Sequence, residues 1–200
     1  MAFIAKTAFE ARGTNNENDI LANVAGLYQA SSANADCSAG LLCVRNGQTP
    51  VEGFPAALGL KNENTYYMNA CAGTENANDV IYACNTYDNQ LLPAPGGNQY
   101  FIGHALLGLG TPAGRYGNWT RINFDNQSWY RFGEGNVTVN TEGDQYFVIA
   151  AGGVLSSVTA KPSTAGDIYF ELKESGDGYF TEGEGQSFGY YDLTACVVKA

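Results

Sequence analysis

Short hydrophobic runs separated by turn-forming residues dominate this chain from residue 41 onward. The runs are rich in Val, Ile, Tyr, Phe, Trp and Thr, which favour strands, and Gly, Asn, Asp and Pro lie between them. Breaks roughly every 8–12 residues are typical of an antiparallel β-sandwich or barrel. We therefore expect a mainly β protein with at most one or two short helices. The predicted strands are 41–45, 65–70, 80–84, 100–107, 119–124, 128–132, 136–140, 145–150, 154–159, 168–173, 179–181 and 190–199.

One short pattern occurs three times. It joins Gly and Asn or Asp to an aromatic pair, and it predicts a turn that leads into a strand. A further turn signal, Asp177-Gly178, predicts a hairpin between strands 168–173 and 179–181. The three copies are Gly97-Asn-Gln-Tyr-Phe101, Gly143-Asp-Gln-Tyr-Phe147 and Gly166-Asp-Ile-Tyr-Phe170.

Residues 1–14 predict an extended N-terminal arm. Phe3, Ile4 and Phe9 are apolar, the segment has more bases than acids, and Gly13 ends the apolar run. Exposed Phe and Ile side chains in a short arm must be buried either in the protein's own body or in a neighbouring molecule.

The next segment, 14–28, carries two conflicting signals. Thr14 and Glu17 have the spacing of a capping box, and the apolar residues from Ile20 to Tyr28 follow a helical spacing. Gly26 and the β-branched residues disfavour a helix. One helix and a strand–loop–strand arrangement are both compatible with this pattern.

Composition divides the rest of the chain. All 19 asparagines fall between residues 15 and 140, whereas the last sixty residues carry nine acids and three bases. The Gly- and Pro-containing stretch 108–117 lies between the two compositions. We therefore distinguish an arm (1–14), an Asn-rich β region (15–110) and an acidic C-terminal β region (111–200), as separate domains or as one continuous assembly.

The net charge of −10 argues against nucleic-acid binding, because a polyphosphate would be repelled. The only arginine cluster, Arg115, Arg121 and Arg131, includes no lysine. The sequence contains no run of about 18 apolar residues, so it predicts no membrane span. The N-terminus lacks the apolar centre of a signal peptide.

The cysteines predict buried, reduced thiols. No C-x₂-C pair occurs and the spacings fit no common zinc pattern, so we expect no metal or other cofactor. The sequence leaves open whether any of them pair. The five are Cys37, Cys43, Cys71, Cys84 and Cys196.

Catalytic patterns are scarce. The one histidine, His104, lies in an apolar run, and no nucleophile elbow, P-loop or H-E-x-x-H motif is present. The carboxylates between Glu171 and Glu184 have the chemistry for glycoside hydrolysis or calcium binding, but their turn-rich spacing favours solvated hairpin turns. We predict that the protein is not an enzyme.

Trp119, Trp129 and Tyr130 are flanked by Asn, Asp and Arg, a setting in which aromatic rings stack on sugars. The alternative is a core tryptophan, because the adjacent residues Trp129 and Tyr130 face opposite sides of any strand. The sugar-stacking interpretation predicts a carbohydrate-binding β-sandwich module on a virion or cell surface.

Three segments carry a resemblance to a known family. They are the apolar arm 2–13, the run Thr164-Ala-Gly-Asp-Ile-Tyr-Phe-Glu-Leu with Gly178-Tyr-Phe-Thr-Glu-Gly, and the ending Tyr191-Asp-Leu-Thr-Ala-Cys-Val-Val-Lys-Ala200. With the Gly- and Thr-rich body between them, they resemble the head decoration (cement) proteins of tailed bacteriophages. The Asn-rich middle and the five cysteines depart from the compact members of that family.

The resemblance implies a non-enzymatic virion protein, made in the host cytoplasm, that binds the capsid exterior and stabilises it. It also implies the major capsid protein as partner, a homotrimer or other homo-oligomer, and neither nucleic acid nor membrane as partner. Phe3, Ile4 and Phe9 are then the expected capsid contacts. A tail-tube or other phage structural subunit is a further interpretation.

Overall fold

The computed structural model describes residues 7–13, 23–29, 37–50, 60–85, 91–93, 99–101, 111, 114, 116–182 and 186–199. Within these ranges the protein is all β, as the sequence predicts, with no helix of seven or more residues. The strands are β1 (Phe9–Gly13), β2 (Asn23–Tyr28), β3 (Leu42–Pro50), β4 (Lys61–Ala70), β5 (Ile81–Cys84), β6 (Leu91–Pro93), β7 (Gln99–Phe101), β8 (Tyr116–Arg121), β9 (Trp129–Gly133), β10 (Val137–Thr138), β11 (Tyr146–Ile149), β12 (Leu155–Val158), β13 (Ile168–Glu182) and β14 (Gln186–Val197), with a 3₁₀ turn η3 (Glu134–Asn136).

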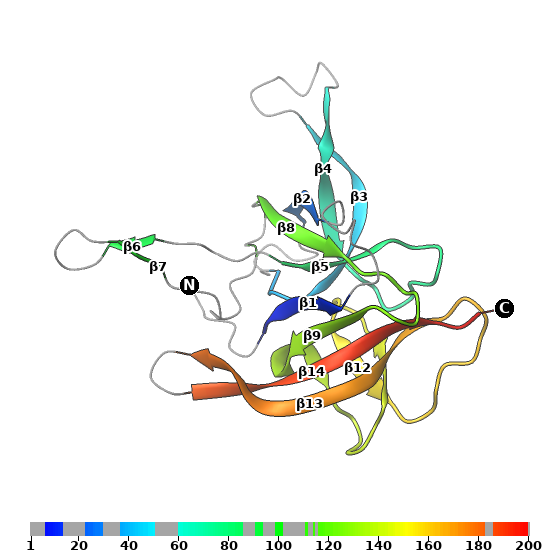
Figure 1. Cartoon of the computed structure of the whole chain (residues 1–200). Coiled ribbons are helices and arrows are strands. Elements are labelled where there is room, and N and C mark those ends of the chain that lie inside the picture. The colour runs from blue at the N-terminus through cyan, green and yellow to red at the C-terminus, as the bar shows by residue number, and fades with distance from the viewer. Residues whose placement is uncertain are drawn as a thin grey trace.

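Two β structures make up the body (Figure 1). A closed barrel has the strand order β2-β4-β3-β5-β8, and a seven-stranded mixed sheet has the order β1-β9-β14-β13-β11-β12-β10. In Figure 1 the barrel lies above the sheet, and β6 and β7 form a separate hairpin at the left. The last strand, β14, and the long strand β13 that pairs with it therefore belong to the sheet.

The side-chain alternation of the strands builds two cores. On β5, Ile81 and Ala83 face the sheet, whereas Tyr82 and Cys84 fill the barrel interior. Successive side chains of a strand point to opposite faces, so one strand serves both cores. The core between barrel and sheet also contains Phe132 from β9, and this shared core joins the two structures.

Residues 9–13 do not form a free arm, which corrects the expectation for this part of the N-terminal segment. They are β1, which pairs antiparallel with β9 at one end of the sheet. Phe9 lies opposite Phe132 in this register. The N-terminal segment therefore enters the described structure at the rim of the sheet.

The helix that one reading of segment 14–28 predicts does not extend over residues 23–28. These residues are β2, which pairs in parallel with β4 and antiparallel with β8; residues 14–22 lie outside the described ranges. Gly26 explains the choice, because a Cβ at this position would lie 2.4 Å from Cγ of Met68. A glycine lets the barrel strands approach closely.

The repeated turn pattern is confirmed at its second and third copies. Gly143 and Gly166 have φ values of 89° and 91°, and the strands β11 and β13 follow them. Glycine adopts such positive φ values without steric cost. In the first copy, residues 99–101 form β7, and Gly97 lies outside the described residues.

The predicted hairpin turn at Asp177-Gly178 is wrong. Both residues lie within β13, where the register with β14 shifts between Gly176 and Phe180. The strands continue to the pair Glu182 and Gln186. The turn-forming pair is accommodated as a β-bulge, which inserts extra residues without ending the pairing.

The chain passes from barrel to sheet later than its composition indicates. Most residues of strand β8 come after the stretch 108–117 in the sequence. Even so, β8 belongs to the barrel, which it closes between β2 and β5. Strand β1 belongs to the sheet although it lies at the other end of the sequence. The compositional division at residues 110 and 111 therefore does not match the division between barrel and sheet.

Candidate functional site

Phe9, one of three expected capsid contacts, lies in the protein's own core. It is 1% exposed, and its ring stacks on Tyr130 and packs edge-to-face on Phe132, with centroid separations of 5.8 Å and 5.3 Å. Its side chain is therefore not available as a surface anchor. The other two expected contacts, Phe3 and Ile4, lie outside the described residues.

Two of the three candidate sugar-stacking residues are also core residues, which corrects the expectation for both. Trp119 is 0% exposed inside the barrel. Tyr130 is equally buried, and its hydroxyl accepts a hydrogen bond of 2.9 Å from the backbone N–H of Asn123. Trp129 is partly exposed on the opposite side of β9, as the alternation of a strand requires. Only Trp129 of the three can meet a ligand.

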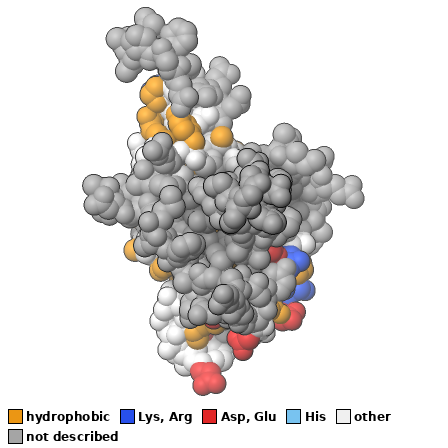
Figure 2. All heavy atoms as spheres, turned by 90° about the vertical axis from the view of Figure 1, so that its left-hand side faces the viewer, with side chains coloured by type: hydrophobic (Ala, Val, Ile, Leu, Met, Phe, Trp, Pro, Cys, Tyr) orange, Lys and Arg blue, Asp and Glu red, His pale blue; other side chains and the backbone are white. Residues whose placement is uncertain are grey.

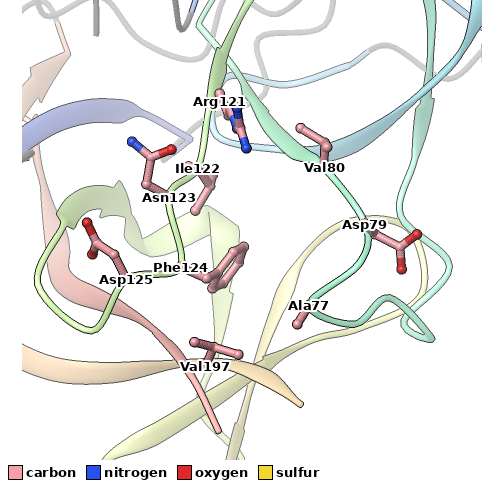
Figure 3. Close-up of a pocket in the computed structure, with 9 residues that line it drawn as sticks. All are labelled: Ala77, Asp79, Val80, Arg121, Ile122, Asn123, Phe124, Asp125 and Val197. Atoms are coloured by element: carbon pink, nitrogen blue, oxygen red, sulfur yellow. The ribbon is translucent and has the colours of Figure 1, made fainter. Parts of the chain in front are cut away.

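A cleft of about 440 Å³ lies where barrel and sheet meet (Figure 3). In Figure 3 the side chains of Val80, Ile122 and Phe124 point into it, while Arg121 extends over its upper rim. The carboxylate of Asp125 points away from the cleft. The cleft therefore has an apolar floor, with Arg121 at its rim and Asp79 also among its lining residues.

Asp125 has a structural role beside this cleft. It accepts hydrogen bonds from the backbone N–H groups of Gln127 and Ser128 and from the Ser128 hydroxyl. Burial raises the pKa of this carboxyl, but the hydrogen bonds outweigh burial and the net pKa is lowered. Asp125 thus closes the turn before β9 as an ionised group.

The open face of the sheet carries a second concavity, of about 650 Å³. Lys161, Tyr169, Glu171, Lys173 and Lys199 contribute to its lining. The volume lies within the roughly 300–1,000 Å³ of small-ligand pockets. This concavity, which we call the lysine depression, brings together three cations from separate parts of the C-terminal region.

Lys161 contacts two neighbours within the lysine depression. Its Nζ lies 3.6 Å from Oε2 of Glu171 and 5.6 Å from the ring centroid of Tyr169. A hydrogen bond with the Tyr169 hydroxyl, together with the negative charge of Glu171, raises the pKa of Lys161. Burial in turn raises the pKa of Tyr169, so its hydroxyl stays neutral.

Motifs and spacing in the sequence do not predict the lysine depression. Its signal is the base count of the acidic C-terminal region: the only three bases after residue 140 are Lys161, Lys173 and Lys199. All three line one concavity. Sequence spacing could not reveal this convergence, because it depends on the pairing of β13 with β14.

A third face shows how charge is distributed elsewhere. Figure 2 shows the side that lies at the left in Figure 1. On its described part, hydrophobic side chains gather near the top, over the barrel, and acidic side chains lie near the bottom, over the sheet. Lys and Arg side chains lie beside some of these acids at the right of the view.

All five cysteines are buried and reduced, as expected. Cys37 and Cys43 lie with their sulfurs 3.9 Å apart inside the barrel. Burial raises the pKa of Cys37 well above its ordinary value, and burial also raises the pKa of Cys71. Neither thiol is activated as a nucleophile, because only the thiolate reacts.

The remaining candidates for catalysis are described only in part. Glu174 accepts a hydrogen bond of 2.9 Å from the Tyr190 hydroxyl, whereas His104 and Glu184 lie outside the described residues. Among the described residues, no three His, Cys, Asp or Glu side chains gather as a metal-binding group.

Comparison with family models, with curated proteins and with solved structures finds no match. No helix in the described part of the chain is long and apolar enough to cross a membrane. Function is therefore inferred from the geometry of this chain and from the resemblance of its sequence.

Proposed function

We propose that this protein is a non-enzymatic phage structural protein that binds the outside of a capsid and stabilises it as a decoration or cement protein. The resemblance of the N-terminal and C-terminal segments to such proteins suggests the role. The major capsid protein is then the partner, and the capsid exterior is the location.

The observation that carries this proposal is the position of β1. Phe9 fixes this strand in the core at the rim of the sheet, so residues 1–6 precede a firmly anchored point. Asn136 holds the same point, because its Oδ1 accepts a 3.0 Å hydrogen bond from the backbone N–H of Ala8. Phe3 and Ile4 therefore precede a rigid attachment by only a few residues, and they are the capsid contacts in this proposal.

The energetics fit a protein that acts in many copies. Full burial of Phe3 and Ile4 on a partner contributes about 1.5–3 kcal/mol for each side chain. A contact of this size is weak alone, but an oligomer that places several such segments on one lattice gains avidity. Binding only to the assembled shell then stabilises the shell by mass action.

Deletion of residues 2–6 tests the proposal. This deletion spares Phe9 and β1, so the shortened protein is expected to keep its thermal stability. We expect it to lose sedimentation with capsids of the same phage, and those capsids to lose the added heat resistance. The matched control is Leu60→Ser, which removes another exposed apolar side chain, 48% exposed, next to the barrel strand β4.

Undiminished capsid binding by the shortened protein would contradict the role of Phe3 and Ile4, and absence of binding by the intact protein would contradict the function itself. Multi-angle light scattering tests the oligomer separately. A molar mass of a single chain at every concentration would contradict the expected trimer.

A further inference from the structure

One row of cross-strand pairs spans the open face of the seven-stranded sheet. Gly13 on β1 pairs with Trp129 on β9, which pairs with Thr194 on β14. Thr194 pairs with Glu171 on β13, and Glu171 pairs with Tyr146 on β11. Paired residues point to the same face of a sheet, so these side chains form one continuous polar and aromatic strip.

Trp129 forms one end of this strip. A Cβ at Gly13 would lie 2.0 Å from Nε1 of Trp129, so the indole lies directly against the backbone of β1. The glycine leaves room for the ring to lie over the strand. Lys173 reaches the same ring, with its Nζ 5.1 Å from the ring centroid. Trp129 and the lysine depression are therefore adjacent through Lys173.

The lining of the lysine depression has a charge opposite in sign to that of the whole protein. The whole chain carries −10, and the last sixty residues carry nine acids against three bases. All three of those bases line the lysine depression, where Glu171 is the only carboxylate among the lining residues. The lining residues thus carry a net charge of about +2, since lysine is positive and glutamate negative at neutral pH.

We propose that this face binds an acidic glycan in which isolated carboxylates are separated by neutral hydroxyl groups. The ring of Trp129 takes the apolar face of one sugar. Lys173, beside Trp129, takes the carboxylate of a neighbouring sugar. Lys199, just beyond the end of β14, takes a second carboxylate of the chain, and Thr194 and Glu171 bind sugar hydroxyls. The site does not depend on capsid binding.

Each part of the strip matches one property of such a ligand. A tryptophan ring offers a flat apolar surface, whereas ammonium groups form charge-assisted hydrogen bonds with carboxylates. Lys173 is exposed, so it can leave the Trp129 ring and turn to the ligand. Lys161 already pairs with Glu171 at 3.6 Å, which leaves Lys173 and Lys199 as the cations for carboxylates.

The same observations disfavour other anions. A densely charged polymer such as a nucleic acid or a heavily sulfated chain would be repelled by the net charge of the protein and by Glu171. An acidic peptide would pair with the lysines, but it has no sugar ring to stack on the strip from Trp129 to Thr194. The mixed chemistry of the strip is therefore better matched by a carboxylated glycan.

Isothermal titration of the full chain tests the proposal with four probes of similar length. The first is a hyaluronan oligosaccharide, in which carboxylated and neutral sugars alternate. The others are a heparin oligosaccharide, a neutral chitin oligosaccharide and a polyglutamate peptide. We expect hyaluronan to bind more tightly than each of the other three.

Two variants separate the parts of the site. Trp129→Ala and Lys173→Glu are each expected to weaken hyaluronan binding by about tenfold or more, the loss that follows removal of a stacking or charge-assisted contact. Lys61→Glu is the matched control, because Lys61 is exposed on the barrel strand β4, away from the strip. It makes the same charge change and is expected to leave binding unaltered.

The proposal is overturned if hyaluronan does not bind, or if heparin or polyglutamate binds as tightly. The first result would show that this face does not bind a carboxylated glycan. The second would identify a general anion site or a site for an acidic protein partner. An equal loss in Lys61→Glu would overturn it as well, because binding would then follow net charge. Lys173 is exposed, so its variant is informative even if Trp129→Ala fails to fold.

Discussion

Arg131 on β9 and Asp192 on β14 form a bidentate ion pair inside the sheet. Nε of Arg131 donates to Oδ1 of Asp192 and Nη2 donates to Oδ2, both at 2.6 Å. The two residues are cross-strand neighbours, and the side chains are 10% and 1% exposed. The ring of Tyr190 lies 3.9 Å from the guanidinium and covers it. The cross-strand pairing therefore brings the ion pair and the Tyr190 ring together at one point of the sheet.

Replacement of Asp192 by Ala is expected to lower the free energy of unfolding by about 3–5 kcal/mol, because the guanidinium stays buried without its carboxylate. Urea denaturation measures this loss. The double variant Arg131→Met with Asp192→Leu is the control and should recover most of the stability, since no unpaired charge remains. A loss below about 1 kcal/mol would show that the pair behaves like an exposed one.

Phe9→Ala is expected to lower the free energy of unfolding by about 3–5 kcal/mol, because it leaves a cavity between β1 and β9. Val139→Ala is the matched control, since Val139 is exposed and its loss should change stability by less than about 0.5 kcal/mol. Thermal or urea unfolding distinguishes the two. Equal effects would mean that β1 is not part of the core.

Asn136 joins the first strand to the barrel. Its Oδ1 accepts from the N–H of Ala8, and its Nδ2 donates to the carbonyl of Ala39 at 2.7 Å. Asn136→Ala leaves both backbone groups without these partners, at a cost of about 1–3 kcal/mol each. Hydrogen exchange should accelerate at Ala8 before the rest of the sheet. Unchanged protection there would contradict this linking role.

The two tryptophans should behave differently in solution. The variant Trp129→Phe retains only Trp119, whose buried indole should be protected from acrylamide quenching. The variant Trp119→Phe retains Trp129, whose fluorescence should be quenched several-fold more strongly. Trp119→Ala should also cost about 3–5 kcal/mol of stability. Equal quenching of the two single-tryptophan proteins would contradict the described faces of β8 and β9.

Stability should fall as the pH rises above about 8.5–9, the range in which thiols of an unfolded chain ionise. Burial raises the pKa of Cys37 and Cys71 in the folded protein. The unfolded state therefore releases protons first, and the free energy of unfolding falls by about 1.4 kcal/mol per thiol for each pH unit. Urea denaturation between pH 8 and 10 measures the slope.

Cys71→Ala is the control for this pH dependence. This substitution lowers the free energy of unfolding at every pH. It should also reduce the decrease in that free energy per pH unit by the contribution of one thiol. Labelling gives a second measurement, because all five thiols should react with a disulfide reagent quickly only after unfolding. A slope that is identical with and without Cys71 would show that other groups cause the alkaline loss.

Local patterns predicted the features that depend on neighbouring residues. The turns at Gly143 and Gly166 and the opposite faces of Trp129 and Tyr130 follow from backbone preferences and strand alternation. The β class follows from the same local signals. The helical spacing before Tyr28 was misleading, because pairing of β2 with β4 and β8 outweighs a weak propensity.

The sequence by itself therefore determined the β class, most strand positions and the alternation of side chains. Only the tertiary structure decided which face is buried, that Phe9 belongs to the core, and that Lys161, Lys173 and Lys199 meet on one open face. The physical reason is that alternation sets which side chains share a face, whereas burial and convergence depend on strand pairing between residues far apart in the chain.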